Sequence, residues 1–295
     1  SRQICDGGIT HAMPGRHAAL RMICASVLFA VSCACLAVEA KLVSYNIRYD
    51  NPADGADAWQ YRKQAVAELL RKHSPDIFGL QEALPHQITE LSLALPEYGW
   101  FGVGRDAGGS GEGVPVFYRK DRYTLLQSDT FWLSETPERP SRGWDAALNR
   151  ICSYGLFEEM PSRHRLWLIN CHFDHAGQTA GIESARLVLE MATRLNTDNS
   201  PLVLMGDFNA EPDSPPIVLL KESLADSRDV SHSQPVGPSG TFSGFAAGNA
   251  VTRRIDYQFI AESDQVKVLG HEVLEDTVNG RYPSDHLPIL VRISF

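Results

Sequence analysis

The sequence has few of the residues on which several common chemistries depend. Of its six cysteines, only Cys152 and Cys171 lie beyond residue 40, and two cysteines are too few for a zinc site built from thiolates. It contains no Walker-type phosphate-binding loop and no motif of a nucleophilic serine. It also lacks internal repeats, coiled-coil heptads and low-complexity segments. These absences argue against P-loop chemistry, thiolate–zinc chemistry and a repeat architecture.

Long hydrophobic runs are also rare, and the one that is present lies near the N-terminus. Residues 1–12 show no hydrophobic periodicity and precede Met13, so we interpret them as upstream sequence. Arg16 and Arg21 then precede an apolar run over residues 22–38, and a small residue follows it. This order is typical of a secretory signal peptide. A membrane anchor is less well supported, because the run is marginally short for a span and a strand-like segment follows directly.

The N-terminal pattern predicts how the rest of the chain is organised. We expect residues 1–40 to be upstream sequence and a cleaved signal peptide, so that the protein is secreted or periplasmic. Lipidation at Cys33 or Cys35 is an alternative, but neither cysteine has a convincing Leu-small-small lead-in. Residues 41–295 contain no stretch that resembles a linker, and we expect them to form a single domain without a membrane span.

Acidic residues outnumber basic residues in this domain. Three of the 27 Lys and Arg residues and two of the 36 Asp and Glu residues lie in residues 1–40, which leaves 24 against 34 and a net charge of −10. An acidic surface repels polyanions, so tight nonspecific binding to duplex nucleic acid is not favoured. A nuclease is still compatible with this charge, because bound metal ions would supply positive charge locally.

The two cysteines of the domain flank a predicted β-hairpin. The segments ICSYGLFEE and RLWLINCHF are separated by the turn PSRH. Centring the turn near Pro161 and Ser162 places Cys152 directly opposite Cys171 on one face of the hairpin. An exported protein permits a disulfide there. Two buried thiols are an equally supported alternative.

Strand and helix patterns alternate along the domain. Helical spacing of apolar residues predicts helices over 58–73, 86–95 and 180–195. Near-continuous apolar strands occur beside alternating ones, which favours two packed β-sheets with helices outside them. The hairpin described above supplies two of the strands, and the others are predicted at 41–47, 76–82, 114–119, 123–133, 201–207, 253–261, 265–274 and 286–295.

Polar side chains lie at the ends of many of these apolar strands. A single Asn or Asp at a strand end is usually a turn residue. Side chains from different strand ends can nevertheless converge on one cleft, so the repeated pattern predicts a shared site. The residues concerned are Asn46, Glu82, His172, Asp174, His175, Asp207, Asn209, Asp256, Asp285 and His286.

The motifs that contain these residues occur in a diagnostic order. SYNIR, LQE, NCHFDH, GDFN, RIDYQF and SDHLPI resemble, in order and approximate spacing, the endonuclease/exonuclease/phosphatase superfamily. The resemblance covers residues 41–295, and SYNIRYDNPADGADAW, FWLSETPE and GWDAALNR further resemble a secreted bacterial subgroup. It implies a four-layer α/β sandwich of two mixed β-sheets flanked by helices, with the active site at one edge. It also implies a phosphoric ester hydrolase that uses Mg²⁺ or Mn²⁺.

Three residues are predicted to hold the metal. Glu82 is suited to a hard cation such as Mg²⁺, which takes few protein carboxylates together with waters and phosphate oxygens. Asn46 supplies a neutral amide oxygen beside it. Asp285 precedes His286 directly, so the two side chains leave the chain in opposite directions and Asp285 can face the metal.

His286 is the predicted general base, because a histidine titrates near neutrality and can take a proton from an attacking water. Such a base needs an orienting partner, and the resemblance implies Asp256. It further implies that Asn209 donates a hydrogen bond to a phosphoryl oxygen and that Asp207 assists the leaving oxygen or positions water. His172 is expected to donate to the developing negative charge. Whether Asp207 is a proton donor or a metal ligand is left open.

Two arginines are further candidates for binding the substrate. Arg62 and Arg150 lie in the sequence where contacts to phosphate can arise. Structural ion pairs are the alternative for both residues.

The predicted activity is hydrolysis of phosphate esters, with phosphodiesters favoured, by in-line attack of a water activated by histidine. A phospholipid-headgroup hydrolase would need an exposed apolar hairpin, but loops 106–113 and 231–249 are polar and rich in glycine, although Phe242 and Phe245 lie in the second. A small phosphate ester is preferred by elimination, and a phosphomonoester is an alternative. A non-catalytic binding module is disfavoured because the whole set of site residues is present. The sequence defines neither the natural substrate nor the oligomeric state.

Overall fold

The computed structural model describes residues 37–261 and 265–295. The predicted signal peptide therefore lies, up to residue 36, outside the described residues. Strand β1 begins at Glu39 and not at residue 41, because Glu39 and Ala40 pair with Ser294 and Ile293 near the C-terminus. In the described part of the chain, no helix is long and apolar enough to cross a membrane.

The first of two six-stranded sheets contains the N- and C-terminal strands of the domain. Its order is β11-β12-β1-β2-β4-β3, and only β1 and β2 are parallel neighbours. The strands are β1 (Glu39–Asn46), β2 (Ile77–Gln81), β3 (Tyr98–Phe101), β4 (Val116–Arg119), β11 (Lys267–Val273) and β12 (Ile289–Ser294).

The second sheet is formed by the middle of the chain. Its order is β5-β6-β7-β8-β10-β9, and only β7 and β8 are parallel neighbours. The strands are β5 (Tyr123–Trp132), β6 (Ile151–Glu159), β7 (Arg165–His172), β8 (Leu202–Asp207), β9 (Leu224–Asp226) and β10 (Asp256–Ala261).

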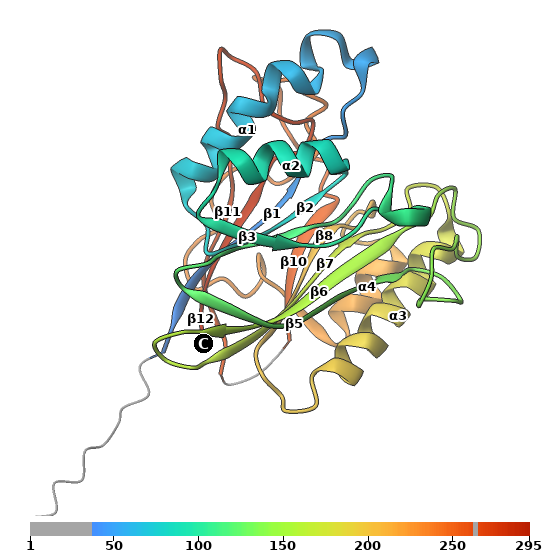
Figure 1. Cartoon of the computed structure of the whole chain (residues 1–295), viewed down its shortest axis with the longest axis vertical. Helices are drawn as coiled ribbons and strands as arrows, with labels where there is room; N and C mark the ends of the chain where they lie inside the picture. Colours follow the sequence, from blue (N-terminus) through green and yellow to red (C-terminus); the bar gives the residue numbers. More distant parts are fainter. Residues whose placement is uncertain (1–36, 262–264) are drawn as a thin grey trace, which may run out of the picture. The chain divides into compact units, whose positions relative to one another are not determined.

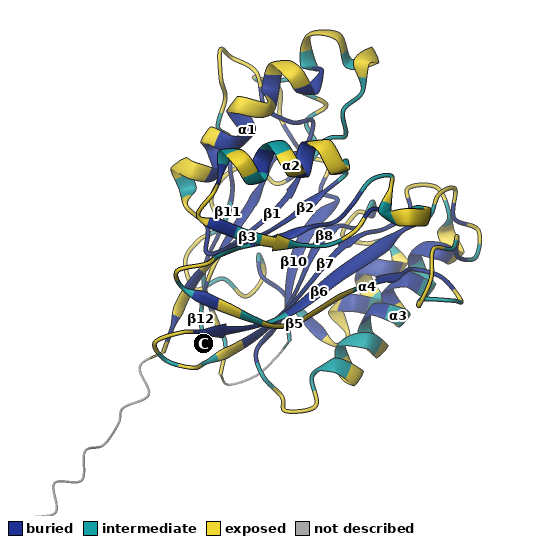
Figure 2. Ribbon diagram, viewed as in Figure 1, coloured by how far each residue is buried: buried dark blue, intermediate teal, exposed yellow. Residues whose placement is uncertain are grey.

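Helices cover the outer face of each sheet, which completes four layers (Figure 1). Helices α1 (Trp59–His73) and α2 (Pro85–Ala94) pack on the first sheet, and α3 (Gln178–Leu195) and α4 (Pro215–Lys221) pack on the second. The central strands are buried almost throughout, whereas the edge strands β3 and β5 and the outer sides of the helices are partly exposed (Figure 2). The predicted α/β sandwich of two mixed, packed sheets is confirmed.

The alternation of side chains in the strands determines which residues enter each layer. In β1, Leu42 lies in the core between the sheets, whereas Val43 and Tyr45 lie in the core under α1 and α2. In β8, Val203 and Met205 share the core between the sheets. Two apolar layers flank each sheet, and this explains the near-continuous apolar character of its central strands.

The hairpin of β6 and β7 has the register predicted from its turn, with Cys152 opposite Cys171. The two cysteines form a disulfide. They lie in the apolar layer between the second sheet and its helices. The next pair in the register joins Ile151 to His172, so the disulfide is directly adjacent to a predicted site residue.

Three elements differ from the prediction or were not predicted. Strands β3 and β9 are short, at four and three residues, and too short to give a periodic signal. Helix α4 begins at Pro215 and Pro216. The sequence analysis predicted no helix at these prolines. They instead occupy the first turn of a helix, where a missing N–H costs nothing.

Candidate active site

Four predicted site residues meet at one edge of the space between the sheets, because they share the strand faces of the inter-sheet core. Asn46 is four residues after Leu42 in β1, and Asp207 is two residues after Met205 in β8. By the same alternation, His172 in β7 and Asp256 in β10 lie on the inter-sheet face. All four are at most 5% exposed. The same strand faces that form the apolar core between the sheets thus carry these polar side chains at the edge of that core.

His286 enters this layer from the loop before β12 and pairs with Asp256. Its Nδ1 lies 2.9 Å from Oδ2 of Asp256, and its Nε2 lies 3.8 Å from Oδ2 of Asp207. Burial disfavours the charged ring, but Asp256 and Asp207 outweigh it and hold the pKa of His286 well above the usual value. The imidazole is therefore oriented through Nδ1, and its Nε2 faces the centre of the site.

Thr241 and Phe242 support this pair, and the sequence analysis had not linked either residue to catalysis. The hydroxyl of Thr241 donates to Oδ2 of Asp256 at 2.5 Å. The ring of Phe242 packs edge-on against His286, with ring centroids 5.1 Å apart. The segment GTFSGF had been noted only as a possible membrane contact. Its actual position depends on the tertiary fold, because Phe242 bridges to His286 across 44 residues of chain.

Asp207 occupies the centre of the cluster. It accepts hydrogen bonds from Nδ2 of Asn46 at 2.9 Å and from the backbone N–H of Asn209 at 2.9 Å. Its Oδ2 also lies 3.5 Å from Nε2 of His172. Burial, with the nearby charge of Asp256, raises the pKa of Asp207 to about 7. Asp207 thus touches every part of the site.

Arg150, His172 and Asn209 form a second group on the other side of Asp207. Nη1 of Arg150 lies 3.0 Å from Nε2 of His172, and Nδ2 of Asn209 lies 3.2 Å from the same atom. Burial and the charge of Arg150 hold the pKa of His172 well below its usual value, so the ring is neutral. The guanidinium and the amide are therefore the hydrogen-bond donors of this group.

Arg150 is buried beside one carboxylate, which also accepts several backbone hydrogen bonds. Its Nε is 3.4 Å from Oδ1 of Asp174, but that carboxylate mainly accepts backbone N–H groups, from Ala147 at 3.1 Å and from Gly177 at 2.8 Å among others. Burial opposes ionisation of Asp174, yet these bonds lower its pKa to about 2. Asp174 therefore orders the loop, and Arg150 keeps much of its charge for an anion.

Asn46 and Glu82 form a further group beside Asp207. Nδ2 of Asn46 donates to Oε1 of Glu82 at 3.0 Å as well as to Asp207. Glu82 follows β2 in the left-handed region (φ 59°), which interrupts the strand alternation. Burial raises the pKa of Asp285, whose Oδ2 lies 3.9 Å from Nε of Arg48.

These side chains fit a divalent cation. Among the described residues, Glu82, His172 and Asp207 form one group whose ligand atoms all lie within 4.8 Å of one another, and Asp207, Asp256 and His286 form another. The amide of Asn46 bridges Glu82 and Asp207. Carboxylate oxygens of this kind suit Mg²⁺ or Mn²⁺. Asp285 lies outside both groups, and its predicted role as a ligand stays a prediction.

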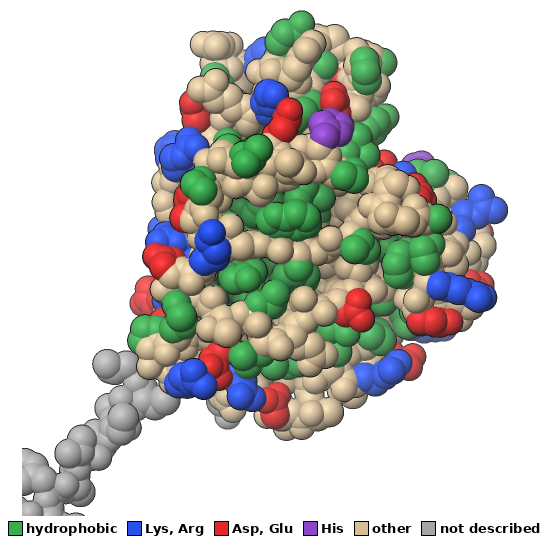
Figure 3. All heavy atoms as spheres, in the orientation of Figure 1, with side chains coloured by type: hydrophobic (Ala, Val, Ile, Leu, Met, Phe, Trp, Pro, Cys, Tyr) green, Lys and Arg blue, Asp and Glu red, His purple; other side chains and the backbone are tan. Residues whose placement is uncertain are grey.

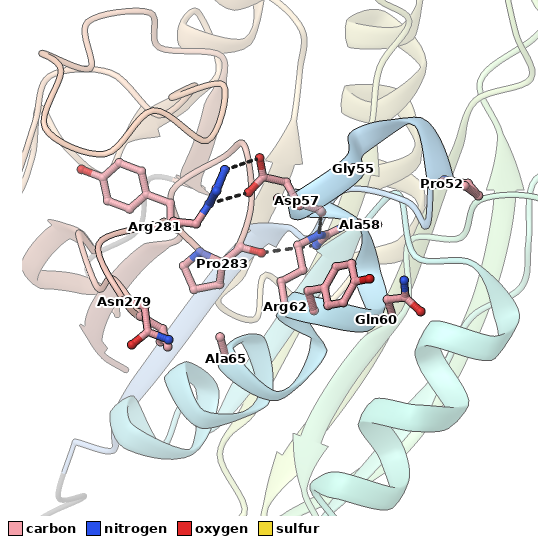
Figure 4. A pocket seen from close by; sticks show the side chains of 14 residues that line it. Pro52, Gly55, Asp57, Ala58, Gln60, Arg62, Ala65, Asn279, Arg281 and Pro283 are labelled. Carbon is pink, nitrogen blue, oxygen red and sulfur yellow. Dashed lines mark hydrogen bonds and ion pairs between the residues drawn. The ribbon is translucent and has the colours of Figure 1, made fainter.

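Arg62 is a structural residue and does not face the predicted phosphate position. It is 5% exposed, and backbone carbonyls accept from all of its N–H groups, of which Figure 4 shows the contact with Pro283. They belong to Ile47, Arg48, Tyr49, Asp57 and Pro283. The guanidinium thus ties the chain after Asn46 to the chain before Asp285. Backbone carbonyls have no sequence signature. The sequence analysis therefore considered a phosphate contact or an ion pair for Arg62 and not this set of backbone hydrogen bonds.

The comparisons with known proteins agree with this fold. Residues 43–286 match the pattern of the Endonuclease/Exonuclease/phosphatase family. A mannosyl-6-phosphatase of Bacteroides thetaiotaomicron is 38% identical with a TM-score of 0.83, over 87% of this chain and 100% of that chain. A family protein from the same organism is 37% identical with a TM-score of 0.83, over 88% and 98% of the two chains.

Curated relatives are matched over less of their length. An uncharacterised protein of Acanthamoeba polyphaga mimivirus is 28% identical over 170 residues, which are 52% of this chain and 60% of that protein. The chain belongs to the endonuclease/exonuclease/phosphatase family, as its motifs had indicated. It is therefore an enzyme of a family that hydrolyses phosphate esters.

Proposed function

We propose that the protein is a divalent-metal-dependent hydrolase of phosphate esters in which His286 activates the attacking water. The observation that carries this proposal is the His286–Asp256 contact of 2.9 Å. It occupies Nδ1 and leaves Nε2 directed at the centre of the site, where it can take a proton from water. Asp256 and Thr241 hold the ring in that orientation, as the third member of a catalytic triad does.

Glu82, Asn46 and Asp285 would hold the metal, which when bound polarises a phosphoryl oxygen and stabilises the transition-state charge. Bound positive charge beside three carboxylates also favours the neutral form of His286 that a base requires. Asn46 would present its oxygen after releasing the two carboxylates that its amide now bridges.

The opposite side of the site would bind the phosphate. Arg150 and Asn209 supply donors in a buried environment, where preorganised donors are most effective. His172 holds both donors through Nε2. Asp207 lies between the two sides, and as a buried carboxyl that can carry a proton it would assist the leaving oxygen.

The substrate is best described as a small phosphate ester. The sequence analysis favours a diester, whereas one observation favours a monoester: a solved neighbour with 38% identity across 87% of this chain is a mannosyl-6-phosphatase. A nuclease is less well supported. On the face shown in Figure 3, Lys and Arg side chains are scattered among Asp and Glu, with no continuous basic track. Export of the protein is proposed on the N-terminal sequence pattern alone.

A screen of phosphate monoesters and diesters tests the proposed function. The purified protein is assayed with Mg²⁺, with Mn²⁺ and with EDTA, and the rate of phosphate or alcohol release is measured. We expect turnover that requires a metal and that EDTA abolishes. A folded protein that turns over no ester with either metal would contradict the proposal. The ratio of monoester to diester rates separates the two substrate classes.

A further inference from the structure

A cavity of about 580 Å³ opens beside the phosphate-binding side of the site. Asn209 and Asp174 form its inner wall, and the first turns of α3 and α4 form its outer walls. A group esterified to a phosphate held by Asn209 must extend away from that residue. This cavity provides the volume for it, and its size falls within the range of small-molecule sites.

The wall of the cavity combines unused hydrogen-bonding groups with a small apolar surface. Gln178 is exposed and makes no side-chain hydrogen bond to any described residue. Glu211 and Arg253 are 66% and 53% exposed at their side chains and approach each other only to 3.9 Å. Pro215 and Ile182 supply apolar surface. Both hydrogen-bond donors and acceptors are therefore available beside a surface that can pack against C–H groups.

A glycine inside helix α3 keeps this cavity open. Glycine is the least favourable non-proline residue in a helix interior, yet Gly181 has an ordinary helical conformation. A Cβ added there would meet only Pro216, at 3.6 and 4.0 Å, which are ordinary contact distances. Neither the backbone nor the packing thus requires glycine. Gly181 lines the cavity, and because it has no side chain it leaves space there.

A second cavity differs in this respect. It measures about 770 Å³ and lies beside Arg62 (Figure 4). The guanidinium of Arg62 is fully used by carbonyls, and Arg281 is paired with Asp57 through two contacts of 3.1 Å. Its lining contains none of the residues proposed for catalysis. Its charged groups serve the fold, whereas those of the first cavity are available to a ligand.

We propose that the cavity between Asn209, Gly181 and Arg253 binds the group esterified to the phosphate, and that this group is a neutral, polyhydroxylated ring such as a hexose. The inference rests on the proposed function and names its substrate class. A sugar ring offers hydroxyls to Gln178, Glu211 and Arg253 and a C–H face to the prolines of α4.

Other occupants match the cavity less well. A nucleobase needs a broad exposed aromatic face for stacking, but Phe208 is 1% exposed and the only other aromatic ring of the lining is the small imidazole of His175, whose Nδ1 lies 2.9 Å from Nη2 of Arg150. A second phosphate needs basic groups, but Arg253 is accompanied by the carboxylates of Glu211 and Asp174. A lipid chain would meet these same charged groups at the rim.

Two variants and one control test the proposal. Gly181→Leu fills the cavity, and Gln178→Ala removes a polar group at its exposed rim. The matched control, Ala65→Leu, adds bulk to the cavity beside Arg62. Each protein is assayed with saturating Mg²⁺ on a hexose 6-phosphate, a nucleoside 5′-monophosphate, a glycerol phosphate and acetyl phosphate, whose acyl group is too small to fill the cavity.

We expect the hexose phosphate to have the highest kcat/KM of the first three substrates for the unaltered protein. Gly181→Leu should lower that value by about tenfold or more, and Gln178→Ala by about fivefold, while acetyl phosphate hydrolysis and the control variant change by less than about twofold. If Gly181→Leu does not fold, Gly181→Ala, which fits without a clash, should give a smaller loss in the same direction.

The outcomes separate this inference from the proposed function. If acetyl phosphate is turned over, three outcomes would overturn the sugar site and leave the hydrolase intact. They are equal losses in the variants on all substrates, no loss in the variants on the hexose phosphate, and a preference of the unaltered protein for the nucleotide or the glycerol ester. Absence of metal-dependent turnover on every ester would overturn both proposals.

Discussion

The two sheets contribute different chemistry to the site, although they are built alike. Each has one parallel pair of strands near its centre, β1 with β2 and β7 with β8. The first sheet supplies oxygen ligands, Asn46 and Glu82, whereas the second supplies the nitrogen donors around His172. Asp207 and His286 lie where the two sets meet. The comparison shows that two sheets of similar build can bring different side-chain chemistry to one edge, and the proposed function assigns the metal mainly to the first set and the phosphate to the second.

The site thus has two halves, one on each sheet, and different interactions hold the residues of each half in place. In the first half, Arg62 ties the loops after β1 and before β12 through backbone carbonyls. In the second half, the Cys152–Cys171 disulfide joins β6 and β7 directly below Arg150 and His172. One support is a polar contact among loops, and the other is a covalent link within a sheet.

Removing the imidazole of His286, which lies where the two sets of residues meet, is expected to have the largest effect on kcat. His286→Ala should lower kcat by about 10²–10⁴-fold, because it removes the imidazole that Asp256 orients toward the centre of the site. The ring is buried among carboxylates, so the folded state of the variant is checked by circular dichroism. Thr241→Val should lose about tenfold and Thr241→Ser almost nothing, since serine keeps the hydroxyl. Unchanged kcat in His286→Ala would refute the assignment of the base.

A pair of variants tests whether metal binding and phosphate binding depend on different halves of the site. Glu82→Gln should weaken Mn²⁺ binding by at least about tenfold, measured by isothermal titration calorimetry without substrate. Asn209→Ala should leave that affinity within about twofold and lower kcat by about 10²-fold. If both variants lost metal affinity equally, the two halves would not be separate in function.

The support in the first half is tested by Arg62→Lys. A lysine has three donors where arginine has five, so two buried carbonyls lose their partners and the free energy of unfolding should fall by about 4 kcal/mol. Arg281→Lys, in an exposed ion pair, should cost about 0–1 kcal/mol. Urea unfolding measures both, and similar losses in the two variants would argue against the role of Arg62 as a clamp.

The support in the second half is tested by removing both cysteines. The disulfide closes a loop with a sequence separation of 19, for which the chain-entropy relation gives about 3 kcal/mol. The Cys152→Ala/Cys171→Ala variant should lose that much stability. Reducing agent should lower the stability of the unaltered protein by a similar amount and leave the variant unchanged. A variant as stable as the parent would show that the hairpin register alone holds His172.

A buried histidine of β11 that is not among the site residues should have the smallest effect. Burial lowers the pKa of His271 to about 3, below the value of about 6.5 in the unfolded chain. The unfolded state therefore binds more protons below pH 6.5, and stability should fall by about 2 kcal/mol between pH 6.5 and pH 5. His271→Gln should remove that part of the slope, and the exposed His232→Gln should not. An unaltered slope in His271→Gln would assign acid sensitivity to the site itself.

The sequence predicts the strands and most of the site for one physical reason. In β1, β7, β8 and β10 the apolar residues extend to the polar ones without a break, so Asn46, His172, Asp207 and Asp256 can be placed on a face by counting. Tertiary contacts are not accessible in this way. The carbonyl set around Arg62, the hydroxyl of Thr241 on Asp256 and the first turn of α4 at Pro215 each depend on segments that are distant in sequence or on a turn with no periodic signal.

The shared strand face of the core and the site has a consequence for how the protein can change. Asn46, His172, Asp207 and Asp256 keep the phase of Leu42, Leu168, Met205 and Ile260. A single inserted residue within any of these strands would move a polar group into an apolar layer and an apolar group into the cleft. An insertion that changes which face the strand residues occupy therefore destabilises the packing of the core as well as the site. We expect changes in substrate range to arise in the connecting segments beyond the strand ends.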